Sequence, residues 1–299
     1  MDLFRLTTEK RNRNSMTLDK MSTLEMLQTI NEEDKKVAFA VEKVLPQIEI
    51  AAENIFRRLS DGGRLIYVGA GTSGRVGVMD ASECPPTFMT ERETVQTVMA
   101  GGMDAFFNAV EGSEDNEEQG KNDLQARNIS ERDTVIGITA SGRTPYPLGA
   151  LKYAKKLGAY TISLTCNQDS EISRQADCKI EVIAGPEILT GSTRMKAATS
   201  HKMILNMIST VTMVKLGKVY ENLMVDVHAS NYKLRERAKW IVREITDVSY
   251  ERAEEVLRQT GYKVKPAIVM LETGATYEEA EQAIKHANGY IREAIGSFS

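Results

Sequence analysis

The sequence predicts an α/β protein built around a parallel β-sheet with helices on both faces. Three runs rich in apolar and β-branched residues, 65–68, 133–139 and 159–165, alternate with segments of helical periodicity. This alternation is typical of a parallel sheet. Two of the runs, 65–68 and 133–139, lead directly into turns rich in glycine and hydroxyl side chains. In an open parallel sheet such turns meet at the carboxyl ends of the strands, where ligands bind.

Helices are predicted before the first strand. Residues 1–21 are polar, and we expect them to be partly extended. Ser22 is a typical N-cap and predicts the start of a helix. Asn31 and the acidic residues after it predict a second helix, at 32–59, whose apolar residues recur at helical spacing. Pro46 predicts a kink or a break in that helix.

The turn after the first strand has the features of a phosphate site. Gly69, Gly71 and Gly74 stand in it, with Thr72 and Ser73 between them. A strand that leads through glycines into a helix presents backbone N–H groups at the positive end of the helix dipole. The two hydroxyl groups can donate further hydrogen bonds to phosphate oxygens, so the turn fits a phosphomonoester.

The same glycines also match the dinucleotide-binding pattern G-x-G-x-x-G. That pattern requires an acidic residue about 20 residues further on, at the end of a second strand. Glu91 and Glu93 stand near that distance, but Pro85 and Pro86 interrupt the unit before them. The prolines instead fix the backbone beside Glu83. An acidic side chain on a rigid backbone, close to an anion site, indicates one half of an active site.

A second turn of this kind follows the run 133–139. It contains Ser141, Gly142 and Thr144, and Pro145 fits the first turn of a helix after it. The alternative is that both turns only cap helices. The acidic run at 111–118 reads most simply, from its residues alone, as a solvated loop.

The composition excludes several classes of protein. The 299-residue chain has 41% hydrophobic and 27% charged residues and a net charge of −4, which gives no reason to expect a nucleic-acid partner. It has no run of about 18 apolar residues, so we expect no membrane span. The N-terminus lacks the apolar core of a signal peptide, and Cys84, Cys166 and Cys178 show no CxxC spacing. We therefore expect a cytoplasmic protein without disulfides or zinc.

Several longer segments together resemble the N-acetylmuramic acid 6-phosphate etherase family, a branch of the sugar isomerase (SIS) fold. They are GAGTSGRVGVMDASECPPTF, AVEGSEDN, ASGRTPY, GPEILTGSTRMKA, GKVYENLMVDV and SNYKLRERA. The resemblance covers nearly the whole chain, and ASECPP and EGSED together are highly specific. It implies a SIS-type sheet with N-terminal helices and a small C-terminal helical appendage. We expect an N-terminal helical segment at 1–60, the SIS domain at 61–218 and a C-terminal helical region at 219–299.

The resemblance implies a lyase that uses neither cofactor nor metal. Such an enzyme removes D-lactate from N-acetylmuramic acid 6-phosphate with water and leaves N-acetylglucosamine 6-phosphate. In the family, the residues that match Glu83 and Glu114 are the acid and the base. Glu83 is thereby assigned as proton donor to the departing lactate, and Glu114 as the base that removes the C2 proton. Burial of Glu83 beside Pro85, Pro86 and Phe88 would favour its protonated form.

The remaining candidate residues bind rather than react. The predicted phosphate site consists of Thr72, Ser73, Ser141, Gly142 and Thr144. Further candidates for contact with the sugar or the lactyl group are Glu187, Ser192, Thr193 and Lys196.

Two other functions use the same fold. An aldose–ketose isomerase shares the removal of the C2 proton but expels nothing from C3. A non-catalytic sugar-phosphate sensor, as in SIS-containing transcription regulators or the glucokinase regulatory protein, would bind without reacting. A transcription regulator needs a helix-turn-helix with a basic face, and the acidic residues within 22–60 disfavour one.

A homodimer is expected. The helix predicted at 193–216 is rich in Met and Ile and offers more apolar surface than one sheet face needs. SIS domains are commonly dimers with their sites near the interface, so the resemblance points the same way.

Overall fold

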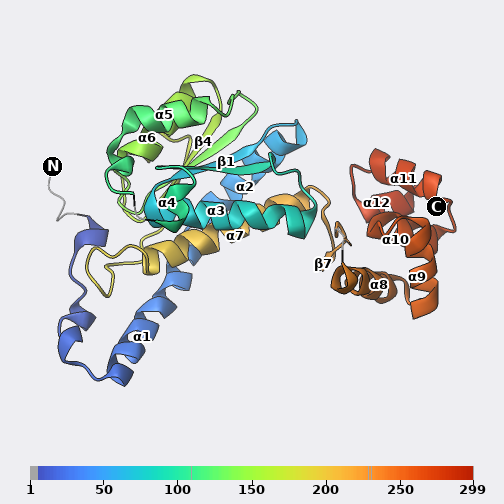
Figure 1. Ribbon diagram of the computed structural model, residues 1–299, viewed down its shortest axis with the longest axis horizontal. Coiled ribbons are helices and arrows are strands. Elements are labelled where there is room, and N and C mark those ends of the chain that lie inside the picture. Colours follow the sequence, from blue (N-terminus) through green and yellow to red (C-terminus); the bar gives the residue numbers. More distant parts are fainter. Residues whose placement is uncertain (1–5, 109, 228, 230, 299) are drawn as a thin grey trace. The chain divides into compact units, whose positions relative to one another are not determined.

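The computed structural model describes residues 6–108, 110–227, 229 and 231–298, and the chain forms two compact units (Figure 1). Unit 1 consists of residues 1–82 and 93–209, and unit 2 of residues 83–92 and 210–299. Two of the three boundaries, after residues 82 and 209, fall within helices, and a short piece from the middle of the sequence, 83–92, belongs to the C-terminal unit.

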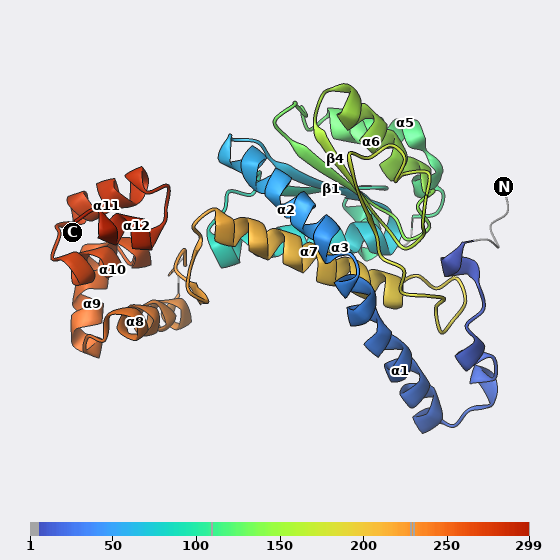
Figure 2. The ribbon, with the colours of Figure 1, turned by 180° about the vertical axis from the view of Figure 1, so that it is seen from behind.

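A five-stranded parallel sheet forms the centre of unit 1 (Figures 1 and 2). Its strands are β1 (Leu65–Gly69), β2 (Val95–Met99), β3 (Thr134–Ile138), β4 (Tyr160–Thr165) and β5 (Cys178–Glu181). They lie in the order β2-β1-β3-β4-β5, and every neighbouring pair is parallel. This confirms the predicted parallel sheet. Because β2 and β3 lie on opposite sides of β1, the winding direction reverses between β1 and β3.

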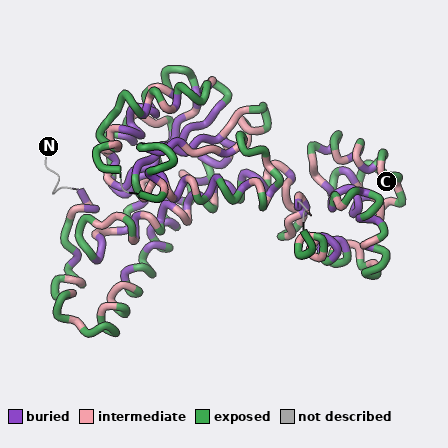
Figure 3. Tube along the Cα trace, viewed as in Figure 1, coloured by how far each residue is buried: buried purple, intermediate pink, exposed green. Residues whose placement is uncertain are grey.

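Helices cover both faces of the sheet, as the alternating sequence pattern predicts. One face carries α5 (Glu117–Gln125) and α6 (Pro145–Lys156), and the other carries α2 (Leu45–Ser60), α3 (Gly71–Phe88) and α7 (Lys196–Lys215) (Figures 1 and 2). Figure 3 shows the strands as a buried centre beneath these helices. In β1, Ile66 and Val68 are fully buried, and they belong to one core with Leu124 of α5 and Leu151 of α6. Burial on both faces explains why the strands read as unbroken apolar runs.

The N-terminal helix is longer than the sequence predicts. Helix α1 (Thr23–Glu42) begins with a capping box in which Ser22 and Glu25 bond each other's backbone N–H. The predicted boundary at Asn31 is wrong, because the helix runs through it unbroken. Ion pairs three residues apart, such as Glu32 with Lys35, follow directly and favour helix over a break.

The predicted break at Pro46 is confirmed, because α2 starts at Leu45 with the proline in its first turn. The polar segment before α1 is partly extended, as predicted, because residues such as Leu6, Lys10 and Asn12 have extended backbone. Between such residues it forms three short 3-10 helices, at Thr7–Glu9, Arg13–Ser15 and Leu18–Lys20. A short helix, α4 (Asp104–Phe107), follows β2.

The C-terminal residues of unit 2 form a small helical domain, as predicted. Its elements are the hairpin strands β6 (Val219–Tyr220) and β7 (Leu223–Met224) and the helices α8 (Tyr232–Thr246), α9 (Tyr250–Gln259), α10 (Val264–Thr273), α11 (Tyr277–His286) and α12 (Ile291–Gly296). Fully buried residues such as Ala238, Leu257 and Ile268 form a core of their own. In the described part of the chain, no helix combines the length and the apolar character that crossing a bilayer requires.

Candidate active site

Two hydroxyl-rich turns lie side by side at the carboxyl edge of the sheet. The last residues of β1 and β3, Gly69 and Ile138, are paired in the ladder. The turns that follow therefore leave the sheet as neighbours, at the point where the winding direction reverses. This is the ligand-binding position of open α/β sheets, and the predicted convergence of the two turns is confirmed.

The glycines of the first turn let α3 start close against β1. A Cβ on Gly69 would lie 2.8 Å from the backbone nitrogen of Gly74, and a Cβ on Gly74 would lie 2.9 Å from the carbonyl oxygen of Gly69. Neither position has room for a side chain. Thr72 and Ser73, both half-buried, lie in the first turn of α3 beside this contact.

The second turn holds a cluster of hydroxyl groups. The Oγ1 atoms of Thr139 and Thr144 lie 2.7 Å apart, and the Oγ of Ser141 is 3.2 Å from the Oγ1 of Thr139. Thr144 is the N-cap residue of α6, yet its side chain does not cap the helix. Gly142 has a φ of +72°, and a Cβ there would lie 2.2 Å from the Cβ of Ser170. Thr139 is a cluster member that the sequence analysis missed, although its place at the end of β3 was a signal.

Glu114 lies in a pocket at the start of α3. The pocket has a volume of about 170 Å³, and its lining includes Gly71, Arg75 and Glu114. Glu114 is exposed on a 3-10 helix, Ser113–Asp115. The Arg75 guanidinium donates to three backbone carbonyls within 105–108, at 2.8–3.0 Å. Arg75, which the sequence analysis missed, thus ties the loop before Glu114 to α3.

Glu83 lies in the last two turns of α3 and belongs to unit 2. The helix continues through Pro85 and Pro86. Because these prolines have no N–H, the carbonyls of Ala81 and Ser82 cannot receive the regular helical hydrogen bond. The Glu83 side chain is exposed, so the burial that would favour its protonated form is not found in this chain.

A buried polar cluster anchors α3 one turn before Glu83. Asp80 accepts a hydrogen bond of 2.9 Å from the hydroxyl of Tyr67 in β1. From α7, it also accepts hydrogen bonds from the ammonium of Lys202 at 3.3 Å and the hydroxyl of Ser209 at 3.4 Å. Asp80 is only 4% exposed, so these contacts offset the cost of burying its carboxylate. Three separate segments supply the cluster, and no sequence spacing pointed to it.

Two of the predicted sugar contacts are buried within unit 1. The carboxylate of Glu187 accepts the backbone N–H of Lys196 at 3.0 Å and of Ala197 at 2.9 Å, which caps the start of α7. The Lys196 ammonium pairs with Glu33 of α1 at 2.7 Å. Glu187 and Lys196 are each only 1% exposed. Both side chains thus hold protein segments together.

Neighbouring polar groups lower the pKa of the Glu33 carboxyl. Burial by itself would raise its pKa, but hydrogen bonds from Lys196, Lys36 and Asn14 outweigh burial and lower the pKa to about 2. The carboxylate is therefore charged at neutral pH and joins α1 to the start of α7.

Ser192 and Thr193 are half-buried in the loop before α7. The N-terminal segment fastens the beginning of the same loop, because Asn12 donates to the carbonyl of Pro186 at 3.1 Å and Ser15 to that of Ile188 at 2.7 Å. The polar residues near the N-terminus thus have a structural role that their composition did not reveal.

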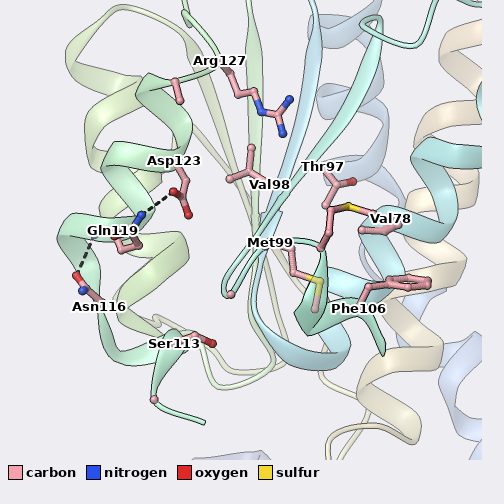
Figure 4. Close-up of a pocket in the computed structure, with 15 residues that line it drawn as sticks. Val78, Thr97, Val98, Met99, Phe106, Ser113, Asn116, Gln119, Asp123 and Arg127 are labelled. Atoms are coloured by element: carbon pink, nitrogen blue, oxygen red, sulfur yellow. Dashed lines mark hydrogen bonds between the residues drawn. The ribbon is translucent and has the colours of Figure 1, made fainter. Parts of the chain in front are cut away.

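The cavity beside the edge strand β2 contains none of the predicted site residues (Figure 4). Its volume is about 590 Å³. Gln119 of α5 donates to Asp123 within it at 2.7 Å, and Asp123 also accepts from Tyr146 at 2.6 Å. Both carboxylate oxygens of Asp123 are therefore hydrogen-bonded within the chain. Among the described residues, no group of three His, Cys, Asp or Glu side chains is placed to hold a metal ion.

The sheet order and the position of the paired turns define an open, doubly wound α/β protein, and family models assign it to the SIS type. Residues 47–155 match the glucokinase regulatory protein N-terminal SIS domain, 111–210 the SIS domain, and 221–287 the C-terminal lid domain of glucokinase regulatory protein. Two solved phosphoheptose isomerases show the same fold. That from Francisella tularensis has a TM-score of 0.53 at 20% identity and covers 65% of this chain and 100% of its own. That from Neisseria gonorrhoeae has a TM-score of 0.51 at 18% identity and covers 64% of this chain and 98% of its own.

Much closer relatives cover the whole chain. The N-acetylmuramic acid 6-phosphate etherase of Bacillus subtilis is 56% identical over 298 residues, which are 100% of this chain and 98% of that protein. The Clostridium beijerinckii protein of the same name is 53% identical over 295 residues, 99% and 97% of the two chains. The chain belongs to the N-acetylmuramic acid 6-phosphate etherase family of carbon–oxygen lyases.

Proposed function

We propose that this protein cleaves the D-lactyl ether of N-acetylmuramic acid 6-phosphate with water, giving N-acetylglucosamine 6-phosphate and D-lactate. The relatives that match it over their full length carry that name. The observation that supports the proposal is the pocket that Glu114 lines together with Gly71 of the first hydroxyl-rich turn, which follows β1 beside the second turn after β3. An acid–base group beside an anion site is what this reaction needs. We propose the cytoplasm as the location of the reaction and cell-wall sugar recovery as its setting.

The phosphate is proposed to bind between the two turns. Thr72 and Ser73 lie at the positive end of the α3 dipole, and the start of α6 lies directly after Thr144. Ser141 and Thr144 supply hydroxyl donors, and Gly142, whose N–H now bonds the Oγ1 of Thr139 at 3.3 Å, is proposed to supply a backbone donor. The hydroxyl groups now bond one another, and a phosphate dianion offers them stronger, charge-assisted hydrogen bonds.

The chemistry then takes two proton transfers. In the open-chain sugar the aldehyde at C1 acidifies the C2 proton, which Glu114 removes. The C3–O bond breaks, Glu83 gives a proton to the ether oxygen, and lactate leaves a C2–C3 double bond. Water adds its hydroxyl to C3 and its proton to C2, so the net reaction consumes one water and needs no cofactor. Both carboxylates are exposed in this chain.

The other residues position the reacting groups. Arg75 holds the loop before Glu114, and Asp80 anchors the helix one turn before Glu83. Ser192 and Thr193 are proposed to contact the sugar or the lactyl group. Glu187 and Lys196, which are buried, are proposed to act there only by holding the loop and the start of α7.

Isotope exchange separates the two carboxylates. Proton NMR in heavy water follows both lactate release and loss of the C2 hydrogen with purified Glu83→Gln and Glu114→Gln variants. General acid–base groups contribute about 10²- to 10⁴-fold, so lactate release should fall by about that factor in both. Glu83→Gln keeps the base and should still exchange the C2 hydrogen, whereas Glu114→Gln should do neither.

Other results would change the assignment. Exchange in Glu114→Gln but not in Glu83→Gln would reverse the two roles. Full lactate release by both variants would remove both residues from the chemistry. If the unchanged protein exchanges the C2 hydrogen but releases no lactate, it is an isomerase, and if it does neither while binding the sugar phosphate, it is a sensor.

We also propose a homodimer. Helix α7, on which the sequence prediction rests, exposes Val211 and Val214 at 45% and 43%. Helix α1 exposes Leu24, Leu27 and Phe39 at 64%, 58% and 64%, and a second copy would cover apolar surface of this kind. Light scattering at micromolar concentration should give twice the chain mass, and a monomer mass would contradict the proposal.

A further inference from the structure

Unit 2 contains a pocket that the proposed reaction does not use. Its volume is about 530 Å³, in the range of small-molecule sites. It is bounded by residues 225–227 and 229 beyond the hairpin, by residues 261–266 and by α11. Four cationic side chains line it, Lys218, Arg235, Lys263 and Lys265, against two acidic ones, Asp226 and Glu281.

Positive charge is in excess where the pocket is most buried. The ammonium groups of Lys218 and Lys265 lie 3.1 and 3.0 Å from the same atom, Oδ2 of Asp226. The Lys265 side chain is 10% exposed and that of Asp226 16%. One carboxylate therefore serves two ammonium ions. Burial lowers the pKa of Lys265, and the negative charge of Asp226 only partly opposes this shift. A second anion would therefore stabilise the charged form of Lys265.

Further features favour an anion in the same pocket. Arg235 lies over the ring of Tyr262, with its guanidinium carbon 5.1 Å from the ring centre. Among the described residues, no acidic side chain forms an ion pair with it. Helix α10 begins at the pocket, and its N-cap residue Lys263 makes no side-chain cap. The N–H groups of its first two residues, Val264 and Lys265, thus add positive potential, whereas Pro266 has no N–H.

The remaining wall is apolar and reaches the end of α3. Val264 and Ile284 line the pocket, as does Met89. Met89 directly follows the last residue of α3 and lies in unit 2 together with Glu83. It adopts a φ of +51°, an uncommon conformation for a residue with a side chain. A molecule in the pocket would therefore contact the segment that carries Glu83.

We propose that this pocket binds a small organic anion, with a phosphate or carboxylate held by Lys218, Lys265 and the start of α10. The body of the molecule packs against Met89 and the apolar wall, so occupancy acts on the end of α3. This goes beyond the proposed reaction, because none of the lining residues belongs to the phosphate turns.

Hydrogen exchange read by mass spectrometry tests the pocket directly. The full-length protein is titrated with inorganic phosphate, D-lactate or N-acetylglucosamine 6-phosphate, and protection is followed in peptides covering 218–227 and 261–266. We expect at least one of these anions to protect both peptides saturably. Lys218→Gln should weaken that binding at least about tenfold, the factor of one hydrogen bond to a charged group. Lys265→Met should do the same if it folds.

Two further proteins make the test decisive. Lys285→Gln removes an exposed charge from α11 outside the pocket and should bind as the unchanged protein does. Ser141→Ala weakens the phosphate turns and should leave the protection of unit 2 intact. The proposal is overturned if no anion protects these peptides, if Lys218→Gln binds as well as Lys285→Gln, or if Ser141→Ala abolishes the protection. The readout is independent of lactate release, so failure of the proposed reaction would be seen separately.

Discussion

Replacement of Glu33 by Gln tests the buried ion pair that joins α1 to α7. The substitution keeps the size of the side chain but leaves the Lys196 ammonium, which is 1% exposed, without its carboxylate. Removing one partner of a buried pair costs about 3–5 kcal/mol. Glu32→Gln is the matched control, because Glu32 is the preceding residue of the same helix and forms an exposed pair with Lys35. That pair should contribute about 0–1 kcal/mol.

The effect has a defined pH dependence. The pKa of Glu33 is about 2 in the folded protein against an ordinary value of 4.5, so the folded state binds this proton more weakly than the unfolded state. The resulting stabilisation, about 3 kcal/mol, is complete above pH 4.5 and is lost as the pH falls from 4.5 to 2. About 2 kcal/mol of it should disappear between pH 7 and pH 3.

Urea denaturation followed by circular dichroism measures both effects. At pH 7 we expect Glu33→Gln to lose about 3 kcal/mol or more of unfolding free energy. The difference between the variant and the unchanged protein should shrink by about 2 kcal/mol at pH 3. Equal losses in Glu33→Gln and Glu32→Gln, or a difference that does not depend on pH, would refute the role given to this pair.

Three further predictions concern the candidate active site. Ser141→Ala or Thr144→Ala removes a donor to the phosphate, worth about 1.5–3 kcal/mol, so kcat/KM for lactate release should fall about 10- to 150-fold with little change in Tm; unchanged kinetics would place the phosphate elsewhere. Gly142→Ala would put a Cβ 2.2 Å from a buried serine side chain, so it should lower both Tm and kcat/KM, and a Tm equal to that of the unchanged protein would contradict the close contact. Arg75→Met breaks three hydrogen bonds to the loop before Glu114; it should lower kcat and speed hydrogen exchange in that loop, and unchanged exchange would show that Arg75 does not hold it.

The sequence predicted the features that depend on residues close to one another along the chain. The strands were visible because both of their faces are buried, which makes them unbroken apolar runs. The break at Pro46 was predictable because proline has no N–H to donate within a helix. The turn at Gly142 was predictable because glycine has no Cβ and tolerates a positive φ. The sequence prediction was wrong where signals that end a helix competed with signals that continue it. Asn31 lies inside α1, and the two prolines after Glu83 lie inside α3.

By itself, then, the sequence determined the α/β class, the two hydroxyl turns and the family. The tertiary structure decided which side chains meet. Asp80 gathers partners from β1 and α7, and Glu33 reaches Lys196 across 163 positions. It also places residues 83–92 in unit 2, whereas the boundaries expected at 60 and 218 stay a prediction. The physical reason is that periodicity and turn chemistry act over a few residues, while buried polar contacts and compact units depend on how distant segments pack.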